Sequence, residues 1–116
     1  MIKLKRAYDP PSSDDGKRLL VERLWPRGVS KAEARIDEWL KHVAPSTELR
    51  KWYDHNVEKW PEFKRRYVDE LEQHGHEVDE IKKMARRKVV TFVYAAHDTE
   101  HNSAVVLKEF VSGRKK

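Results

Sequence analysis

The chain has 116 residues, a formal net charge of +5 at pH 7 and no cysteine. This length predicts a single domain over residues 1–116 that can bury a core of its own. The lack of cysteine excludes disulfides, thiolate metal sites and cysteine nucleophiles. The N-terminus carries no apolar run with the length of a signal peptide or a membrane span. We therefore expect a cytoplasmic protein with no membrane partner.

Charged residues make up 39% of the sequence, against roughly 25% in ordinary domains. Acidic and basic side chains are interleaved, and only two methionines accompany them. This bias is typical of heat-adapted proteins. A thermophilic source is therefore one expectation, and it predicts a melting temperature above the ~45–65 °C of mesophilic domains.

Two strands are predicted near the N-terminus. Residues 2–8 alternate apolar and basic side chains, which indicates a half-exposed strand at the edge of a sheet. Residues 9–16 are rich in turn formers. Residues 18–25 form a largely apolar run, which suits a strand covered on both faces. The gap between the strands is slightly short for a parallel crossover, so a parallel arrangement and a hairpin are both open.

A helix is predicted to begin at Ser30, because Ser30 and Glu33 have the spacing of a capping box. Apolar side chains then recur on one helical face. The positions of this face are Ile36, Trp39, Leu40 and Val43. Pro45 stops the helix, and Ser46 is placed to cap a short second helix.

Two longer helices follow a loop at residues 54–57. The third helix is predicted over residues 58–74, with aromatic and aliphatic side chains on one face and Gly75 at its end. A fourth helix has its apolar positions within residues 78–85. It finishes in three cations, which are favourable at the negative end of the helix dipole.

The most hydrophobic stretch, residues 89–96, predicts a strand inside the sheet, because the run is almost continuously apolar. Residues 97–102 form a turn, and a last helix has its apolar positions within residues 104–111. This order of strands and helices indicates an α/β fold. We expect a small, mostly parallel sheet of about three strands flanked by helices.

Four segments of the sequence match a known family. They are residues 5–9 (KRAYD), 20–28 (LVERLWPRG) and 44–50 (APSTELR), and Asn102 followed by the apolar run at 104–107. With these segments the chain resembles, over nearly its whole length, the YeaO-like family of small bacterial and archaeal proteins. The resemblance implies a three-layered α/β fold of Rossmann-like character. It implies no particular activity, substrate or cofactor.

Two guanidiniums and a helix start lie close together after the second strand. Arg23 and Arg27 leave the same strand end, Gly28 permits a sharp reversal, and the helix predicted from Ser30 has free amides at its start. Paired arginines bind phosphate or carboxylate groups through parallel hydrogen bonds, and helix N-termini attract anions. The stretch therefore predicts a site for a small phosphate- or carboxylate-bearing ligand, a nucleotide among them, with or without its turnover.

Further residues join this site if the strands are parallel, because open α/β sheets bind ligands at the carboxyl ends of their strands. Tyr8 follows the first strand, and Asn102 opens the last helix from the opposite side. The alternative is that Arg23 and Arg27 pair internally with carboxylates such as that of Asp37. In that case the protein is a structural or adaptor protein without a ligand site. The sequence indicates no particular cofactor or oligomeric state.

The segment before the last helix holds the candidates for metal binding and proton transfer. His97 and His101 have the i, i+4 spacing of metal ligands, but no third ligand accompanies them, so we expect no metal site. Asp98 and His101 are the candidates for proton transfer if the site catalyses a reaction. A simpler interpretation is that Asp98 or Thr99 caps the last helix.

Runs of basic residues support a second hypothesis. They lie at residues 64–66, 82–83, 86–88 and 114–116. A surface made from them predicts a module that binds nucleic acid or another polyanion through phosphate contacts. Acidic residues interrupt the runs, and the sequence holds no RNA-recognition signature. Nucleic-acid binding is therefore the alternative to the small anionic ligand.

Overall fold

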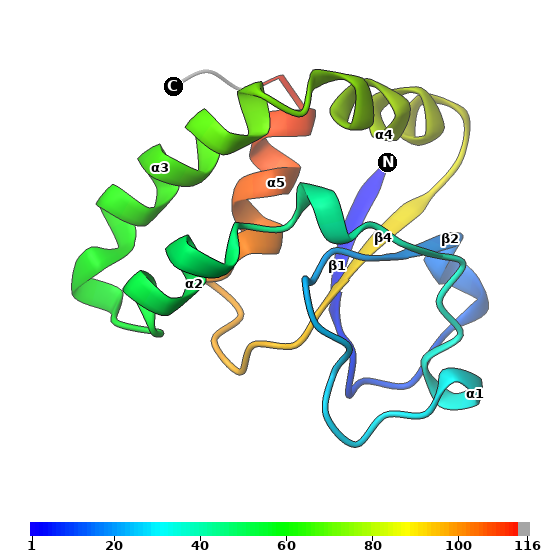
Figure 1. Ribbon diagram of the computed structural model, residues 1–116. Coiled ribbons are helices and arrows are strands. Elements are labelled where there is room, and N and C mark those ends of the chain that lie inside the picture. The colour runs from blue at the N-terminus through cyan, green and yellow to red at the C-terminus, as the bar shows by residue number, and fades with distance from the viewer. Residues whose placement is uncertain (114–116) are drawn as a thin grey trace.

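The computed structural model describes residues 1–113 and has a parallel sheet at its centre (Figure 1). The strands are β1 (Ile2–Arg6), β2 (Lys17–Leu20), β3 (Glu38–Trp39) and β4 (Val90–Tyr94), in the order β1–β4–β2–β3. Every neighbouring pair is parallel. Since β1 and β2 both run parallel to β4, the predicted parallel arrangement is confirmed and the hairpin alternative is wrong.

The burial of each strand follows its place in the sheet. All five residues of β4 are buried, as the apolar run predicts for an interior strand. β1 lies at the edge, and its five residues are only partly buried. In the register, Ile2 lies beside Val90 and Leu4 lies beside Phe92. These side chains therefore share one face of the sheet.

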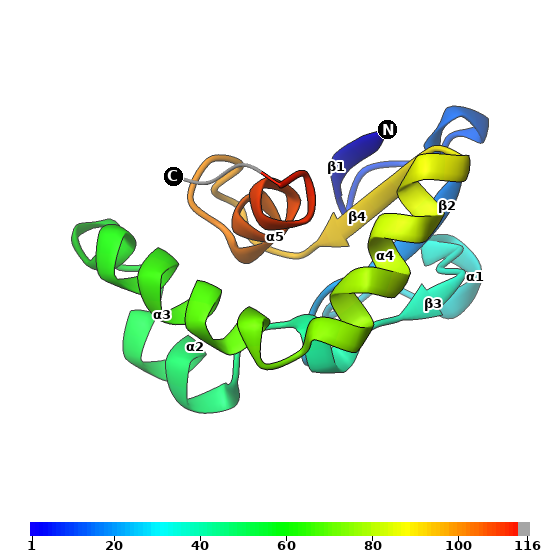
Figure 2. The same cartoon turned by 90° about the horizontal axis from the view of Figure 1, so that it is seen from above.

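Helices surround this sheet. The α-helices of the described chain are α1 (Lys31–Ala34), α2 (Thr47–Tyr53), α3 (Trp60–Glu72), α4 (Gly75–Arg87) and α5 (Ser103–Val111). The short 3-10 helices are η1 (Ser13–Asp15), η2 (Lys41–Val43) and η3 (Val57–Lys59). In Figure 2, α1 lies beside β3, at the opposite end of the molecule from α2 and α3. None of the helices in this part of the chain is long and apolar enough to span a membrane.

The two faces of the sheet carry unequal layers. On one face, Leu19 and Phe92 of the strands join a large buried core with residues of α2 to α5. On the other face, Leu20 and Val93 join only a small cluster with Ala7 and the partly buried side chains of Trp25 and Ile36. The fold is therefore α/β, and its second covering layer is thin.

The second strand is shorter than the sequence predicts, because β2 ends at Leu20 rather than at Trp25. Val21 still donates a backbone hydrogen bond to Val93. At the next position the side chain of Glu22 accepts the hydrogen bond of the Ala95 amide, with Oε2 2.9 Å from the nitrogen. A carboxylate thus replaces the backbone partner that a longer strand would need, and the ladder stops.

The first predicted helix is also wrong beyond its first turn. Ser30 and Glu33 form the predicted capping box, but α1 ends at Ala34, and Arg35 adopts a left-handed conformation with φ 49°. The chain then extends into β3, with the amide of Asp37 donating to the carbonyl of Arg18. Pairing with β2 therefore overrides the helical spacing of the apolar residues.

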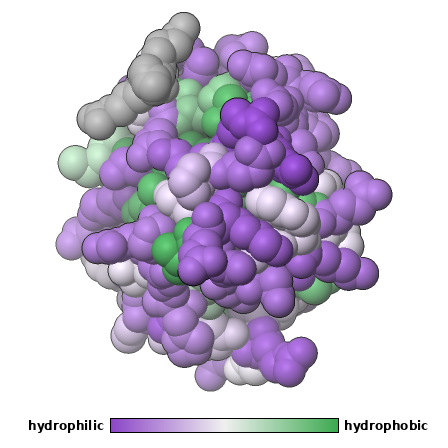
Figure 3. Space-filling view, turned by 90° about the vertical axis from the view of Figure 1, so that its left-hand side faces the viewer, coloured by the Kyte–Doolittle hydropathy of each residue, from purple (hydrophilic) through white to green (hydrophobic). Residues whose placement is uncertain are grey.

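The remaining helices agree with the sequence more closely. Ser46 caps α2 and Asn102 caps α5, each accepting a backbone hydrogen bond of the first turn. α3 covers most of the predicted range of residues 58–74. Gly75 differs from its prediction, because it begins α4 instead of ending the helix before it. Hydrophilic side chains cover most of the face of the molecule that lies on the left in Figure 1, as Figure 3 shows.

Candidate functional site

The carboxyl ends of β1, β2 and β4 surround a pocket of about 520 Å³, which we call the rim pocket. Its wall includes Tyr8 after β1, Glu22 after β2 and Ala95 after β4. α2 contributes Arg50 near its end, and α5 contributes Ser103 at its start. The pocket lies where open parallel sheets bind their ligands.

Basic and imidazole side chains outnumber acids around this pocket. The cations are Arg27, Arg50 and Lys51, the imidazoles are those of His55, His97 and His101, and the carboxyl groups are those of Glu22 and Asp54. Within residues 1–113, the guanidiniums of Arg27 and Arg50 form no hydrogen bond and no ion pair. The pocket therefore offers two forked donors to a ligand.

Tyr8 is fixed against the loop that carries Arg27. The hydroxyl of Tyr8 donates to the carbonyl oxygen of Arg27 at 2.9 Å, and the guanidinium of Arg6 lies 5.1 Å from the centre of the Tyr8 ring. The structure thus brings together the two predicted residues Tyr8 and Arg27. The side chain of Arg27 is exposed and lines the pocket.

Glu22 places a carboxyl group among these donors. Burial raises the pKa of Glu22 above its usual value of 4.5. The Ala95 amide opposes this rise, and so do the positive charges of Arg50 and His55. Oε2 receives the Ala95 hydrogen bond, whereas Oε1 receives none from the described residues. The side chain lines the pocket and keeps one carboxylate oxygen free as an acceptor.

Tyr53 adds a buried donor to the same pocket. Its side chain is only 6% exposed and stacks on Phe63, with ring centres 4.4 Å apart. Its hydroxyl is buried and has no hydrogen-bond partner among residues 1–113. Burial raises the pKa of the Tyr53 hydroxyl above its usual value, and the charge of Asp98 raises it further. The hydroxyl is thus a neutral donor without an acceptor.

Asn102 and its neighbours form the start of α5. Oδ1 of Asn102 accepts from the Val105 amide at 3.0 Å, and Nδ2 donates to the Asp98 carbonyl oxygen at 2.9 Å. Asn102 lines the rim pocket, but both ends of its amide are engaged in this cap. Asn102 therefore holds the first turn of α5 beside the pocket.

Asp98 and His101 lie 2.9 Å apart, measured from Oδ2 to Nδ1. The Asp98 carboxylate also accepts from the amides of Glu100 and His101. These backbone hydrogen bonds, with His101 as a further cause, hold the pKa of Asp98 below its usual range. His101 lines the rim pocket and Asp98 does not. No group of three histidine or acidic side chains in the described chain could hold a metal ion.

The other predicted ligand residues lie outside the pocket wall. The guanidinium of Arg23 donates to the carbonyl oxygens of Ala44 and Pro45, at 3.0 and 3.1 Å. Gly28 has the positive φ that the turn requires, at 79°. Ser30 caps a helix of four residues, which has too few aligned amides for the anion site that the sequence predicts.

The basic runs are partly neutralised by acids. Arg65 and Arg66 both pair with Glu62, and Lys64 pairs with Glu109 at 3.6 Å. Residues 114–116 lie outside the described residues. No observation therefore adds to the case for a nucleic-acid surface on α3.

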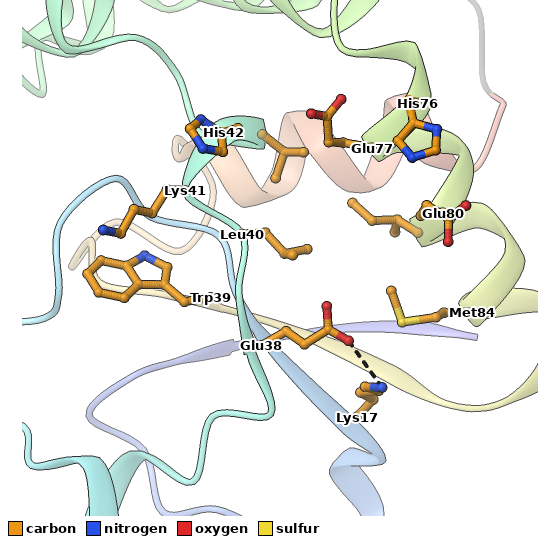
Figure 4. A pocket seen from close by; sticks show the side chains of 12 residues that line it. Lys17, Glu38, Trp39, Leu40, Lys41, His42, His76, Glu77, Glu80 and Met84 are labelled. Atoms are coloured by element: carbon orange, nitrogen blue, oxygen red, sulfur yellow. Dashed lines mark ion pairs between the residues drawn. The ribbon is translucent and has the colours of Figure 1, made fainter.

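A second pocket of about 460 Å³ lies between β3, η2 and α4 (Figure 4). Leu40 and Met84 contribute apolar surface to it, and Lys17 pairs with Glu38 at 3.2 Å on its wall. None of its lining side chains is a buried polar group without a partner in residues 1–113, in contrast to Tyr53 in the rim pocket. The rim pocket is therefore the better candidate.

Comparisons with known proteins agree over the whole chain. A family model described as "Inactive DUF488-N3 subclade" matches residues 1–116. The chain is 42% identical over 110 residues to the uncharacterized protein YeaO of Escherichia coli (strain K12), covering 95% of this chain and 96% of that protein. It is 41% identical over 113 residues to the uncharacterized protein Rv3073c of Mycobacterium tuberculosis (strain ATCC 25618 / H37Rv), covering 97% and 95%. No solved structure matches the chain significantly.

Proposed function

The chain belongs to the inactive DUF488-N3 subclade and, as the sequence predicts, to the family of YeaO-like proteins, and we propose that it binds a small anionic ligand in the rim pocket without transforming it. The ligand carries a phosphate or carboxylate group. A cytoplasmic location is part of this proposal.

The observation that carries the proposal is that the guanidiniums of Arg27 and Arg50 are available to a ligand. Both line the pocket, and neither guanidinium has a partner within residues 1–113. A guanidinium presents a planar fork of donors that matches the two oxygens of a phosphate or carboxylate group. Arg50 comes from α2 and Arg27 from the loop after β2, so an anion between them would join two separate parts of the pocket wall.

Two further features support an anion in this pocket. The hydroxyl of Tyr53 is a buried donor that lacks an acceptor, and an unpaired buried donor is costly unless a ligand or water satisfies it. The first turn of α5, a helix of nine residues, meets the pocket at Ser103. Free amides at a helix start favour negative charge.

The absence of turnover is supported by two observations. The family description itself contains the word "inactive". In the structure, the candidate acid–base pair of Asp98 and His101 is built into the cap before α5, where the Asp98 carboxylate receives two backbone amides. Asp98 does not line the pocket, so its carboxylate is not placed to act on a ligand there as a general base.

The test is a titration with inorganic phosphate, followed through the backbone amide signals in a 15N NMR spectrum at low ionic strength. We expect shifts at Tyr8, Tyr53 and Ser103. Arg27→Lys and Arg50→Lys each keep the charge but remove the fork, and each weakens binding about five- to tenfold.

The matched control is Arg65→Lys, because Arg65 lies on α3 away from the pocket and pairs with Glu62. This variant keeps the affinity of the unmodified protein. Equal losses in all three variants would show that the effect is not specific to the pocket, and an absence of phosphate binding at low salt would remove the proposal.

A further inference from the structure

We infer that the ligand of the rim pocket is a ribonucleoside monophosphate, with its ribose hydroxyls bound by Glu22. This inference rests on the proposed function. It names the chemical class of the ligand and assigns to Glu22 a role that an anion-binding pocket alone does not require.

A carboxyl group is out of place in a pocket that binds only an anion. Glu22 lies at the end of β2, on the wall that also holds Arg50, and a carboxylate repels a second anion at short range. Its presence is explained if the ligand presents hydrogen-bond donors to it. Oε2 is occupied by the Ala95 amide at 2.9 Å, and Oε1 is free of the described residues.

Vicinal hydroxyl groups are the donors that suit this acceptor. An acidic side chain at the carboxyl end of a strand binds the ribose hydroxyls of nucleotides in many open α/β sheets. The ribose is neutral, so it can lie against Glu22 while the phosphate lies elsewhere in the pocket. An ammonium group would also satisfy the carboxylate, but Arg50 already places positive charge near Glu22.

Aromatic side chains provide a surface for the base. Tyr8 and Trp25 line the pocket and are not buried, and aromatic rings bind nucleobases by stacking. Tyr8 is 46% exposed, so its ring is accessible to a ligand at the pocket mouth.

The pocket has the capacity for a ligand of this size. Its volume of about 520 Å³ lies within the roughly 300–1,000 Å³ of small-molecule sites. Inorganic phosphate would fill only a small part of it. The phosphate of the nucleotide would take the position beside Arg27, Arg50 and the first turn of α5. The remainder of the ligand would fill the space between Glu22 and the aromatic side chains.

The experiment compares ligands that differ by one hydroxyl group. The four ribonucleoside 5′-monophosphates, their 2′-deoxy counterparts and inorganic phosphate are titrated into the protein by calorimetry. At least one ribonucleotide binds ten times more tightly than phosphate, and its deoxy counterpart binds about ten times more weakly, because Glu22 loses a charge-assisted hydrogen bond. Glu22→Gln removes this preference and does not weaken phosphate binding, because it takes a negative charge away from the pocket wall.

The variant keeps an acceptor for the Ala95 amide, and a melting curve verifies its fold. Asp54→Asn is the matched control, because Asp54 is the other carboxyl group on the pocket wall; it keeps the ribose preference. Equal affinities for the ribo and deoxy forms, or a preference that survives Glu22→Gln, overturn the inference while phosphate binding still upholds the proposed function. If neither phosphate nor any nucleotide binds, both fail.

Discussion

The guanidinium of Arg18 and the carboxylate of Asp15 form a buried ion pair, with Nη1 and Oδ2 2.6 Å apart. Nε of Arg18 donates to the carbonyl oxygen of Ala34, and Lys5 reaches the same carboxylate at 2.9 Å. The hydroxyl of Thr91 donates to the backbone carbonyl of Asp15. A charged network therefore joins β1, β2 and β4 to η1 and α1 on the thinly covered face of the sheet.

Loss of the Asp15 charge should destabilise the fold strongly. Asp15→Asn leaves the charge of Arg18 buried without its counterion, which costs about 3–5 kcal/mol of unfolding free energy. Urea denaturation at pH 7 measures the difference. Asp14→Asn is the control, because Asp14 is exposed, and it changes the free energy by less than about 0.5 kcal/mol. A loss below 1 kcal/mol for Asp15→Asn, about the value of a surface pair, contradicts the argument.

The same carboxylate predicts a dependence on pH. Burial alone raises the pKa of Asp15, but hydrogen bonds from Lys5 and the Ser12 amide, followed by that from Arg18, outweigh it. The pKa therefore lies below its usual value of 3.8. A lowered carboxyl pKa stabilises the fold above the unfolded value and stops doing so as pH falls through the folded value. The gap between the protein and Asp15→Asn should hence be constant from pH 7 to pH 5 and narrow below pH 3.8.

Gly16 and Gly28 should respond very differently to replacement by alanine, although both have positive φ. A Cβ at Gly16 would lie 2.1 Å from the carbonyl oxygen of Val89, which accepts the backbone hydrogen bond of Lys17. Gly16→Ala therefore separates β2 from β4 and costs more than about 3 kcal/mol. A Cβ at Gly28 meets nothing within 4 Å, so only the conformational cost of about 1–2 kcal/mol applies. Thermal melting of both variants measures the two losses of stability. Equal losses would contradict the prediction that Gly16→Ala is the more harmful.

Local signals predicted much of this fold. The continuous apolar run around Phe92 identified the interior strand, and the caps at Ser46 and Asn102 identified two helix starts. The segment from Ile36 to Val43 was misassigned because its apolar residues have helical spacing. There the amides of Asp37 and Leu40 donate to carbonyls of β2, and no local pattern records such pairing.

Only part of the candidate site follows from the sequence, because contacts between distant segments leave no local pattern. Tyr8 and Arg27 follow from the rule that ligands lie at strand ends. Glu22 was hidden inside a strand that the sequence makes too long. Tyr53 lies in the short second helix, for which the sequence indicates a cap at Ser46 and no site residue. One signal points to Glu22 and Arg50, because both lie within the segments that carry the family resemblance, residues 20–28 and 44–50.

Arg23 and Arg27 should separate stability from binding. Lysine in place of Arg23 cannot donate to both carbonyls, those of Ala44 and Pro45, so Arg23→Lys lowers the unfolding free energy by about 1–2 kcal/mol. It leaves phosphate affinity unchanged. Arg27→Lys weakens phosphate binding and leaves the free energy of unfolding unchanged, because the exposed Arg27 side chain makes no contact that stabilises the described fold. Urea denaturation of both variants measures stability, and titration with phosphate measures affinity. A loss of phosphate binding in Arg23→Lys would contradict the prediction.

Glu22 should make the protein less stable as it ionises. Burial raises its pKa above 4.5 in the folded protein, while the unfolded chain keeps the usual value. A raised carboxyl pKa contributes stability below the unfolded value, and this contribution disappears as pH rises through the folded value. The physical reason is that, at a pH between the two pKa values, the folded protein binds a proton at Glu22 that the unfolded chain does not bind.

Glu22→Gln removes this titration but keeps the acceptor for the Ala95 amide. The variant and the unmodified protein should therefore have similar melting temperatures below pH 4.5. As pH rises from there to 7, the variant should become the more stable of the two, because it has no carboxylate to ionise in a partly buried position.

Glu33→Gln is a suitable contrast, since hydrogen bonds from Ser30 lower the pKa of Glu33. The Glu33→Gln variant should lose stability relative to the unmodified protein as pH rises. Melting curves at pH 4, 5.5 and 7 measure both trends, and a Glu22→Gln difference that stays constant over this range contradicts the assignment of Glu22 as a carboxyl group with a raised pKa.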